Sequence, residues 1–356
     1  MTKHNVFFGE AQKMNKIADN SVDLIVTSPP YPMIEMWDEI LFKQNNAIKE
    51  AFDKAQFEAS FELMHQELDK VWQESFRVLK KGGLACINIG DATRTLNKNF
   101  RLFSNHARII EGFINTGFQN LPNIIWRKQT NAPNKFMGSG MLPPGAYVTL
   151  EHEFILIFRK GEKRAFKTNN EKENRQNSSY FWEERNLWFS DLWNIKGTTQ
   201  KIKNKKSRDR SAAYPFEIPY RLINMFSAQN DVVLDPFLGT GTTTLAAIAS
   251  KRNSIGYDID KKFKDLIFSN ITNQEPFIND YITNRLKNHV DFVSERKKIK
   301  GNDAFKYKNN HYNFEVITRQ ELEIKIPFVK KITTTNTEIT ADYHDAIGLT
   351  PEQKNQ

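Results

Sequence analysis

The sequence predicts an α/β protein with a Rossmann-like sheet, helices on both faces and an inserted polar region. Short apolar runs typical of buried strands alternate with longer stretches in which apolar residues recur every three or four positions, as they do in helices. Two predicted strands lead directly into special loops, a Pro-Pro loop early in the chain and a Gly-rich loop late in it. The length of 356 residues suits one large domain of this class with insertions.

The first part of the chain is predicted to alternate strands and helices. Residues 1–37 are expected to form a strand, a helix and a second strand before the Pro-Pro loop. Residues 52–79 show the helical period, and Lys81-Gly82-Gly83 is expected to end that helix, since glycines favour helix C-termini and turns. Strands are further predicted at residues 84–89, 123–127 and 153–158, with a helix at residues 103–115.

The later part continues the same alternation after a polar segment. Charged helical stretches are expected to run to about residue 300. The tail contains alternating patches at residues 314–316 and 322–328, which suggest a small β appendage. Helices are predicted at residues 219–226 and 242–250, and strands at residues 231–234 and 254–257.

The composition predicts an intracellular protein without a membrane span. Hydrophobic residues make up 39% of the chain, and no run approaches the roughly 18 apolar residues of a membrane-spanning helix. The first residues contain no apolar segment typical of a signal peptide. The single cysteine, Cys86, excludes an intramolecular disulfide framework and a multi-cysteine zinc site. Its apolar neighbours predict a buried strand position, and the seven histidines show no metal-binding spacing, so no metal is expected.

The net charge of +9 favours a polyanionic partner. Most of this charge lies in residues 159–210, which contain 15 Lys and Arg against 7 Asp and Glu. Tryptophans interleave with the basic residues there, which favours nucleic-acid binding, although the polar composition also fits a solvated, partly disordered insertion. The residues expected to contact phosphates are Lys201, Lys203, Lys205, Lys206 and Arg208.

The Pro-Pro loop, Ser28-Pro29-Pro30-Tyr31, follows the apolar run of residues 22–26. Two prolines stop the strand and stiffen the turn at its carboxyl end, where open α/β sheets place their chemistry. Ser28 and the Pro29 carbonyl can accept hydrogen bonds from an NH2 group, and Tyr31 can stack on a flat heterocycle. The alternative is an ordinary tight Pro-Pro turn without a functional role.

The Gly-rich loop spans residues 235–243 and joins a predicted strand to a helix. Gly239 and Gly241 allow the backbone to approach a ligand, and the helix start offers free N–H groups to an anion. Asp258 ends the next strand, at the position where an acid binds the hydroxyls of a ribose. Thr244 replaces the third glycine of dinucleotide enzymes, and a carboxylate-bearing ligand suits this turn better than a pyrophosphate. These features favour S-adenosylmethionine over NAD.

The two loops, in this order, resemble the amino-group DNA methyltransferases of the permuted β class. The resemblance covers about residues 3–265 and implies a methyltransferase sheet that binds S-adenosylmethionine, with an inserted target-recognition region. Residues 7–10 resemble the strand that carries an acid near the cofactor adenine, with Glu10 in place of Asp. Residues 212–219 resemble a motif that caps the cofactor, and residues 123–128 resemble a strand beside the base pocket.

These correspondences imply a set of site residues. Catalysis is assigned to Ser28, Pro29, Pro30 and Tyr31, and the base pocket to Trp126 and Lys128. The cofactor-binding residues implied are Glu10, Tyr214, Pro215, Asp235, Phe237, Gly239, Gly241, Thr242 and Asp258.

The expected reaction is methyl transfer to the exocyclic amino nitrogen of a base flipped out of double-stranded DNA. Ser28 at the first loop position favours cytosine-N4 by resemblance, and adenine-N6 is the alternative. Carbon-5 methylation would need a Pro-Cys loop, which Cys86 does not provide. The rival hypotheses are a non-catalytic DNA-binding relative and an RNA or protein amide methyltransferase, which commonly carries Asn-Pro-Pro-Tyr.

The chain is expected to divide into four parts. Residues 1–160 would form the catalytic half, residues 161–210 the target-recognition region and residues 211–300 the cofactor-binding half, with a C-terminal extension at residues 301–356. The resemblance further implies a DNA-associated protein of the prokaryotic cytoplasm in a restriction-modification system. The sequence leaves open a cognate restriction endonuclease as partner and a homodimer.

Overall fold

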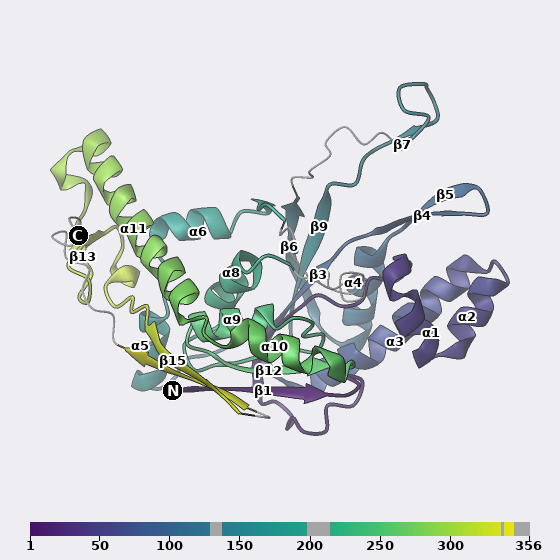
Figure 1. Ribbon diagram of the computed structural model, residues 1–356. Coiled ribbons are helices and arrows are strands. Elements are labelled where there is room, and N and C mark those ends of the chain that lie inside the picture. Colours follow the sequence, from purple (N-terminus) through teal and green to yellow (C-terminus); the bar gives the residue numbers. More distant parts are fainter. Residues whose placement is uncertain (129–136, 198–213, 336–337, 345–356) are drawn as a thin grey trace.

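The computed structural model describes residues 1–128, 137–197, 214–335 and 338–344. Their main feature is a mixed sheet of ten strands with helices on both faces (Figure 1). The α/β fold predicted from the sequence is therefore confirmed. In spatial order, the strands are β10 (Leu192–Asn194), β6 (Gln119–Arg127), β9 (His152–Arg159), β3 (Leu79–Ile89), β2 (Val22–Thr27), β11 (Val232–Asp235), β12 (Asn253–Asp258), β1 (Thr2–Phe8), β16 (Glu338–His344) and β15 (Phe328–Thr334).

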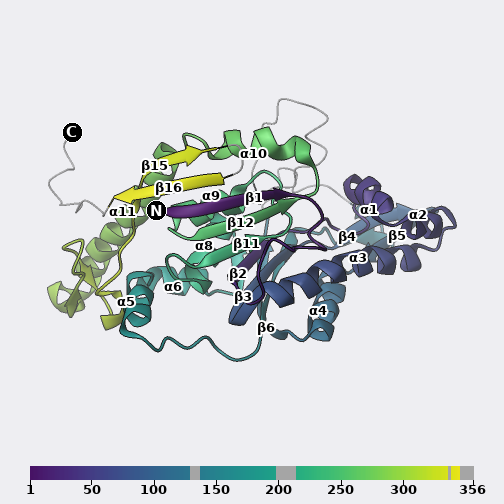
Figure 2. The same ribbon diagram turned by 90° about the horizontal axis from the view of Figure 1, so that it is seen from below.

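The centre of the sheet is parallel, and its strand order reverses between β2 and β11 (Figure 2). From β11 the chain continues to β12 on one side, whereas from β2 it continues to β3 on the other. Ligands of open α/β sheets bind at the carboxyl ends of the strands beside such a reversal. Both special loops follow these two strands, so the topology brings them to the same edge.

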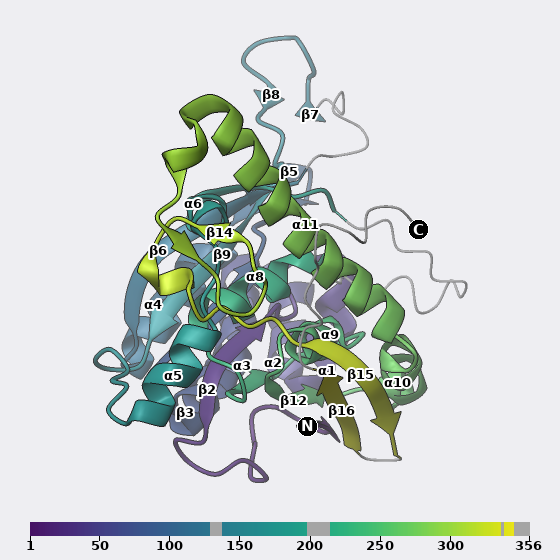
Figure 3. The ribbon, with the colours of Figure 1, turned by 90° about the vertical axis from the view of Figure 1, so that its left-hand side faces the viewer.

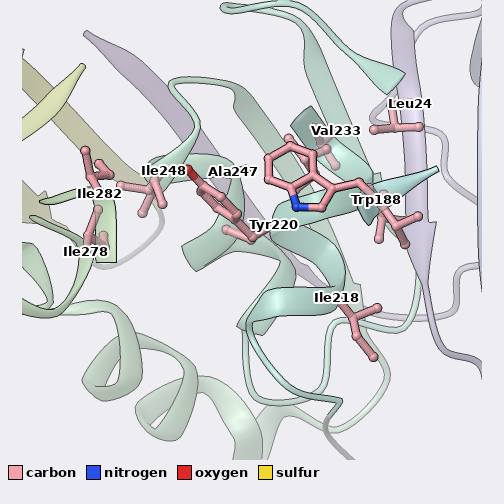
Figure 4. Packing of buried hydrophobic residues seen from close by; sticks show 14 of the residues in the cluster. Leu24, Trp188, Ile218, Tyr220, Val233, Ala247, Ile248, Ile278 and Ile282 are labelled. Atoms are coloured by element: carbon pink, nitrogen blue, oxygen red, sulfur yellow. The ribbon is translucent and has the colours of Figure 1, made fainter. Parts of the chain in front are cut away.

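Two helical layers cover the sheet, and β2 contributes to the core on both sides. Leu24 and Val26 face one cluster, whereas Ile25 faces the other, as expected for side chains that alternate along a strand. Figure 4 shows part of the first cluster, where Leu24 and Val233 of the sheet lie near the helical residues. The first layer contains α8 (Glu217–Phe226), α9 (Thr242–Ala249), α10 (Lys264–Ile271) and α11 (Glu275–Lys300), and the second contains α3 (Phe57–Val78) and α4 (Asn105–Thr116).

Several shorter elements surround the site edge of the sheet. Two of these elements are β-hairpins, and both project from the body (Figure 1). The predicted helix at residues 52–79 consists of α3 and the end of a separate short helix before it. The shorter elements around the site edge are α1 (Asp38–Gln44), α2 (Asn46–Asp53), the hairpin of β4 (Ala92–Leu96) and β5 (Asn99–Phe103), and the hairpin of β7 (Met137–Gly138) and β8 (Ala146–Tyr147).

The helix expected between the first two strands does not form. Residues 9–21 contain turns, because side chains of α3 bind their backbone groups instead of a local helical ladder. The Arg77 guanidinium donates to the carbonyls of Met14 and Ile17, each at 3.0 Å. Glu74 accepts from the Met14 N–H at 2.8 Å. These tertiary contacts outweigh the local helical pattern.

The expectation that Lys81-Gly82-Gly83 ends a helix is also wrong. The helix ends at Val78, and the glycines lie inside β3 where its register with β2 shifts. Gly82 has a φ of +83°, and its N–H donates to the Lys160 carbonyl at 2.7 Å. A Cβ at Gly82 would lie 2.6 Å from the Arg164 backbone nitrogen. The glycines therefore permit a close backbone approach within a bulged strand.

The C-terminal tail extends the main sheet. β16 pairs antiparallel with β1, and β15 forms its outer edge beside α11 (Figure 3). The patch at residues 314–316 overlaps β14 (Glu315–Val316), which pairs with β13 (Tyr307–Lys308). The patch at residues 322–328 is not a strand until its last residue. Its backbone is bound by side chains, since the Tyr312 hydroxyl accepts from the Ile326 N–H at 2.6 Å.

The described part of the polar segment also joins the body. Residues 161–197 form α5 (Asn169–Asn177), α6 (Trp182–Trp188) and β10, the last of which pairs with β6. Trp188 and Trp193 are 6% and 1% exposed and belong to the core. These two tryptophans are therefore structural. No helix in the described ranges is long and apolar enough to cross a membrane.

Candidate active site

Asp235 connects the two special loops on their buried side. Its carboxylate accepts from the Thr27 hydroxyl, directly before the Pro-Pro loop, and from the Thr243 hydroxyl at the start of α9, both at 2.5 Å. The Phe237 N–H donates to it at 3.0 Å. Asp235 is 3% exposed, and this burial raises its pKa to about 6. The residue holds the loops together and is covered by them.

The Gly-rich loop adopts the backbone that its glycines permit. Gly241 has a φ of +88° and directly precedes α9. The Asp258 carboxylate accepts from the N–H groups of Gly239 at 2.9 Å and Asp260 at 2.8 Å. Burial raises the pKa of Asp258 to about 6. Each carboxylate oxygen can accept further hydrogen bonds, as binding to a diol requires.

Both loops open into one pocket, which brings together six of the residues expected from the sequence. Other walls come from the turn after β1, the start of α1 and the middle of α3. A ligand in this pocket would therefore touch the residues assigned to catalysis and those assigned to the cofactor. The six residues are Glu10, Ser28, Pro30, Phe237, Gly239 and Asp258.

Most of the other expected residues lie buried behind the loops. Tyr31 is 7% exposed and Tyr214 is 8% exposed. The Tyr214 hydroxyl lies 2.5 Å from the Thr243 hydroxyl, and burial raises the pKa of Tyr214 well above its ordinary value. Pro29, Pro215 and Gly241 are also buried, and Thr242 is half-buried.

A polar network that the sequence did not predict lies beneath the Pro-Pro loop. The Tyr31 hydroxyl donates to Glu153 at 2.9 Å and lies 3.1 Å from the Ser28 hydroxyl. The Asn88 amide donates to Glu153 at 2.7 Å and to Tyr31 at 2.8 Å. Asn88 and Glu153 come from β3 and β9, so the sheet places them together. The only sequence signal is a polar residue within each of two apolar strands.

The two residues expected in the base pocket have different surroundings. Trp126 is 2% exposed, and its indole N–H donates to the Ile195 carbonyl at 2.8 Å within the core. Lys128 is partly exposed and forms an ion pair with Glu153, while its ammonium lies 4.6 Å from the centre of the Trp126 ring. Trp126 thus supports Lys128, which in turn reaches the network under Tyr31.

The pocket also contains residues that the sequence analysis did not select. Glu67 is 4% exposed and accepts from the side-chain amide of Gln12 at 3.0 Å and from that of Asn45 at 2.9 Å. Glu67 and Gln12 both line the pocket. Glu67 lies in the regular helical pattern of α3, which offers no signal of a site. The five basic residues expected on DNA phosphates lie outside the described residues.

The fold and the two loops agree with comparisons to known proteins. A family model described as DNA methylase, for N6 and N4 methyltransferases, matches residues 22–269. The match includes β2, the Pro-Pro loop, the Gly-rich loop and Asp258, and it covers more than half of the chain.

The chain belongs to this DNA methylase family.

Full-length relatives support the assignment. The type II methyltransferase M.MthZI of Methanothermobacter thermautotrophicus is 51% identical over 327 residues, which cover 91% of this chain and 90% of the relative. The type II methyltransferase M.MjaI of Methanocaldococcus jannaschii is 54% identical over 277 residues, which cover 75% and 90%. Similarity on this scale covers most of the chain.

A solved structure of a similar protein supports the identity of the cofactor. A protein from Thermus thermophilus, assigned as a DNA modification methylase and solved in complex with S-adenosyl-L-methionine, superposes with a TM-score of 0.59 at 30% identity. The superposition covers 75% of this chain and 93% of that one. S-adenosylmethionine is the cofactor of the methylase. The pocket fits this cofactor, because it combines an acid for a diol with a Gly-rich turn at a helix start.

Proposed function

We propose that this methylase transfers a methyl group to the N4 amino nitrogen of cytosine in double-stranded DNA. The observation that carries the proposal is the single pocket lined by Ser28 and Pro30 from one loop and by Gly239 and Asp258 from the other. In that arrangement a base held at the first loop meets a cofactor held at the second. The first position of the Pro-Pro loop, Ser28, supports cytosine over adenine, since Ser-Pro-Pro-Tyr resembles the cytosine-N4 loop.

The amino nitrogen of a base needs help because its lone pair is delocalised into the ring. Ser28 and the Pro29 carbonyl accept hydrogen bonds from the two amino hydrogens, which localises the lone pair on nitrogen. The cofactor supplies an electrophilic methyl group on a sulfonium. The nitrogen attacks the methyl carbon as the bond from that carbon to sulfur breaks, the cofactor leaves as a neutral thioether, and the extra amino proton passes to water. Positioning and electrostatics are sufficient for this step, and no covalent enzyme intermediate is needed. Tyr31, which the sequence suggested as a stacking residue, is buried behind the loop, so its role in this proposal is to support Ser28 through its hydroxyl.

The cofactor residues have separate roles in this proposal. Asp258 accepts from the ribose hydroxyls, and Glu10 accepts from the adenine amino group. The Thr242 backbone N–H at the start of α9 faces the cofactor carboxylate, while Gly239 and Gly241, whose own N–H groups bind Asp258 and the Leu238 carbonyl, give the turn its close approach. Phe237 packs at the pocket wall, while Asp235, Tyr214 and Pro215 support the loop from the buried side. Lys128 lies at the edge of the base site, and Trp126 supports it from the core.

The wider biological role follows from the relatives and from the charge. Both archaeal relatives are named type II methyltransferases, which supports a role in a restriction-modification system with a cognate endonuclease. The base must leave the duplex to reach the first loop. We assign target recognition to residues 161–210 and phosphate contact to Lys201, Lys203, Lys205, Lys206 and Arg208 within them. The flanking parts, residues 1–160 and 211–300, form the catalytic and cofactor-binding halves, and residues 301–356 extend the fold.

The decisive experiment is a methylation assay on DNA with isotopically labelled S-adenosylmethionine, followed by mass spectrometry of the nucleosides. N4-methylcytosine is the expected product. N6-methyladenine alone would replace the cytosine assignment and leave the loop chemistry intact, because both bases present an N–C–NH2 edge. A protein that binds DNA and S-adenosylmethionine but transfers no methyl group to any sequence would refute the proposed function.

A further inference from the structure

The Ser28 hydroxyl can rotate, so its value as an acceptor depends on where its own hydrogen points. An amino group offers only hydrogens along its N–H bonds, and a serine hydrogen aimed at it would repel it. We propose that Glu153, acting through Tyr31, fixes the direction of the Ser28 hydroxyl and thereby keeps Ser28 an acceptor toward the target amino group. The inference deepens the proposed function and rests on it. Glu153 and Asn88 are positioning residues in this scheme.

The Glu153 carboxylate sets the direction of the hydrogen bonds from Glu153 through Tyr31 to Ser28. A carboxylate only accepts hydrogen bonds, so the Tyr31 hydroxyl must donate to the Glu153 oxygen that lies 2.9 Å away. The Tyr31 hydroxyl keeps its hydrogen, because burial and the charge of Glu153 raise the pKa of Tyr31 well above its ordinary value. Its single hydrogen is thus committed to Glu153.

The same carboxylate fixes the Asn88 amide. The amide nitrogen lies 2.7 Å from Glu153, and the opposite orientation would place two oxygens against each other. The nitrogen therefore also donates to the Tyr31 oxygen at 2.8 Å and lies 3.4 Å from the Ser28 oxygen. Asn88 is 3% exposed, so water does not compete freely for these bonds.

The Ser28 hydroxyl can take only one role in its contact with Tyr31. Its oxygen lies 3.1 Å from the Tyr31 oxygen, whose own hydrogen is already used. Ser28 must therefore be the donor in that contact. Its hydrogen then points toward Tyr31 and away from the pocket that Ser28 lines, and its lone pairs stay available for the target amino group.

Because of Lys128, a single substitution can test the direction of the hydrogen bonds between Glu153, Tyr31 and Ser28. Its ammonium, which only donates, pairs with the second carboxylate oxygen of Glu153. In Glu153→Gln the amide must turn its oxygen toward Lys128, and its NH2 group then faces Tyr31 and Asn88. The Asn88 amide turns with it, and the Tyr31 hydrogen is no longer committed to residue 153. The Tyr31 hydroxyl can then donate to Ser28, and the Ser28 hydrogen is released to point at the amino group.

The test is therefore a comparison of kcat and cofactor affinity between the wild type and Glu153→Gln. We expect kcat for DNA methylation to fall by about 10- to 100-fold, as for outer groups that orient a functional side chain from behind it, with the Kd of S-adenosylmethionine unchanged within about twofold. The matched control is Glu321→Gln. Glu321 is also a buried carboxylate, 2% exposed, that accepts from the Thr318 N–H at 2.7 Å, and it lies outside the residues assigned to the active site and to target recognition. This control should lower the melting temperature and leave kcat within about twofold.

A double-mutant cycle separates direction from general structural support. Tyr31→Phe removes the hydroxyl that links Glu153 to Ser28, so adding Glu153→Gln in that background should change kcat less than about threefold. If Glu153→Gln retains wild-type kcat, or if the two losses multiply, the positioning role is refuted. A wild type that methylates no DNA amino group, in contrast, would refute the proposed function itself.

Discussion

The two loops of the active site are held in opposite ways. The Pro-Pro loop has rigid prolines, and its polar side chains are fixed by other side chains, namely Asn88 and Glu153. The Gly-rich loop bends through left-handed glycines, and the Gly239 N–H is held by the Asp258 carboxylate. The first loop thus presents a side chain in a defined direction, whereas the second presents backbone. The difference predicts that turnover is sensitive to side chains of the first loop and cofactor affinity to charge at the second.

The largest effect is expected at the first loop. In Ser28→Ala the target amino group loses an acceptor that acts in the transition state, so kcat should fall about 100- to 1,000-fold. The Kd of S-adenosylmethionine, measured by calorimetry, should stay within about twofold. Ser21→Ala, at the opposite end of β2, is the control and should behave as the wild type. A large change in Kd with kcat retained would show that the two loops do not divide their roles as proposed.

A substitution at the Gly-rich loop's partner Asp258 should change the affinity for the cofactor. Asp258→Asn keeps the size of the side chain but removes its charge, and hydrogen bonds to charged groups contribute about 1.5–3 kcal/mol. The Kd of S-adenosylmethionine should rise about 10- to 100-fold, with kcat at saturating cofactor changed only a few-fold. The exposed Asp265→Asn, in α10, is the charge-matched control. An unchanged Kd would mean that the ribose lies elsewhere.

The dependence of cofactor affinity on pH provides a smaller and independent test. Burial raises the pKa of Asp258 to about 6, so the charged form that accepts from the ribose is lost as the pH falls through 6. Affinity should therefore weaken below pH 6, by at most about tenfold per pH unit, and stay constant above it. Titration calorimetry from pH 5 to 8 measures this effect. Asp258→Asn should remove the dependence, whereas Ser28→Ala should retain it.

The sequence revealed each loop but not what holds the first. The strand before it is an apolar run broken only by Asp23, and the spacing from the Gly-rich loop to Asp258 is local, so both can be read from nearby residues. Asn88 and Glu153 are separated by 65 residues and meet only because β3 and β9 pair antiparallel. The turns of residues 9–21 depend in the same way on Arg77 of α3. Interactions that arise from strand pairing or helix docking leave only weak local signals, such as a polar residue in an apolar strand.

The smallest effect on function is expected at Thr27, which binds Asp235 between the two loops. Thr27 is 1% exposed, and its hydroxyl donates to Asp235 at 2.5 Å. Thr27→Val keeps the shape but leaves the buried carboxylate with one donor fewer, which should lower the free energy of unfolding by about 1–3 kcal/mol. Thr243 and the Phe237 N–H still bind Asp235, so both loops keep their positions. We therefore expect kcat and the Kd of S-adenosylmethionine to change less than about fivefold.

Denaturant unfolding and activity of the same Thr27→Val preparation test this expectation together. Thr95→Val is the control, since Thr95 is exposed on β4 and its hydroxyl supports neither loop; its unfolding free energy should match the wild type within about 0.5 kcal/mol. If Thr27→Val reduced kcat as strongly as Ser28→Ala, Asp235 would be setting the position of the first loop. The side-chain network under Tyr31 would then be insufficient to hold Ser28, and the contrast between the two loops would fail at that point.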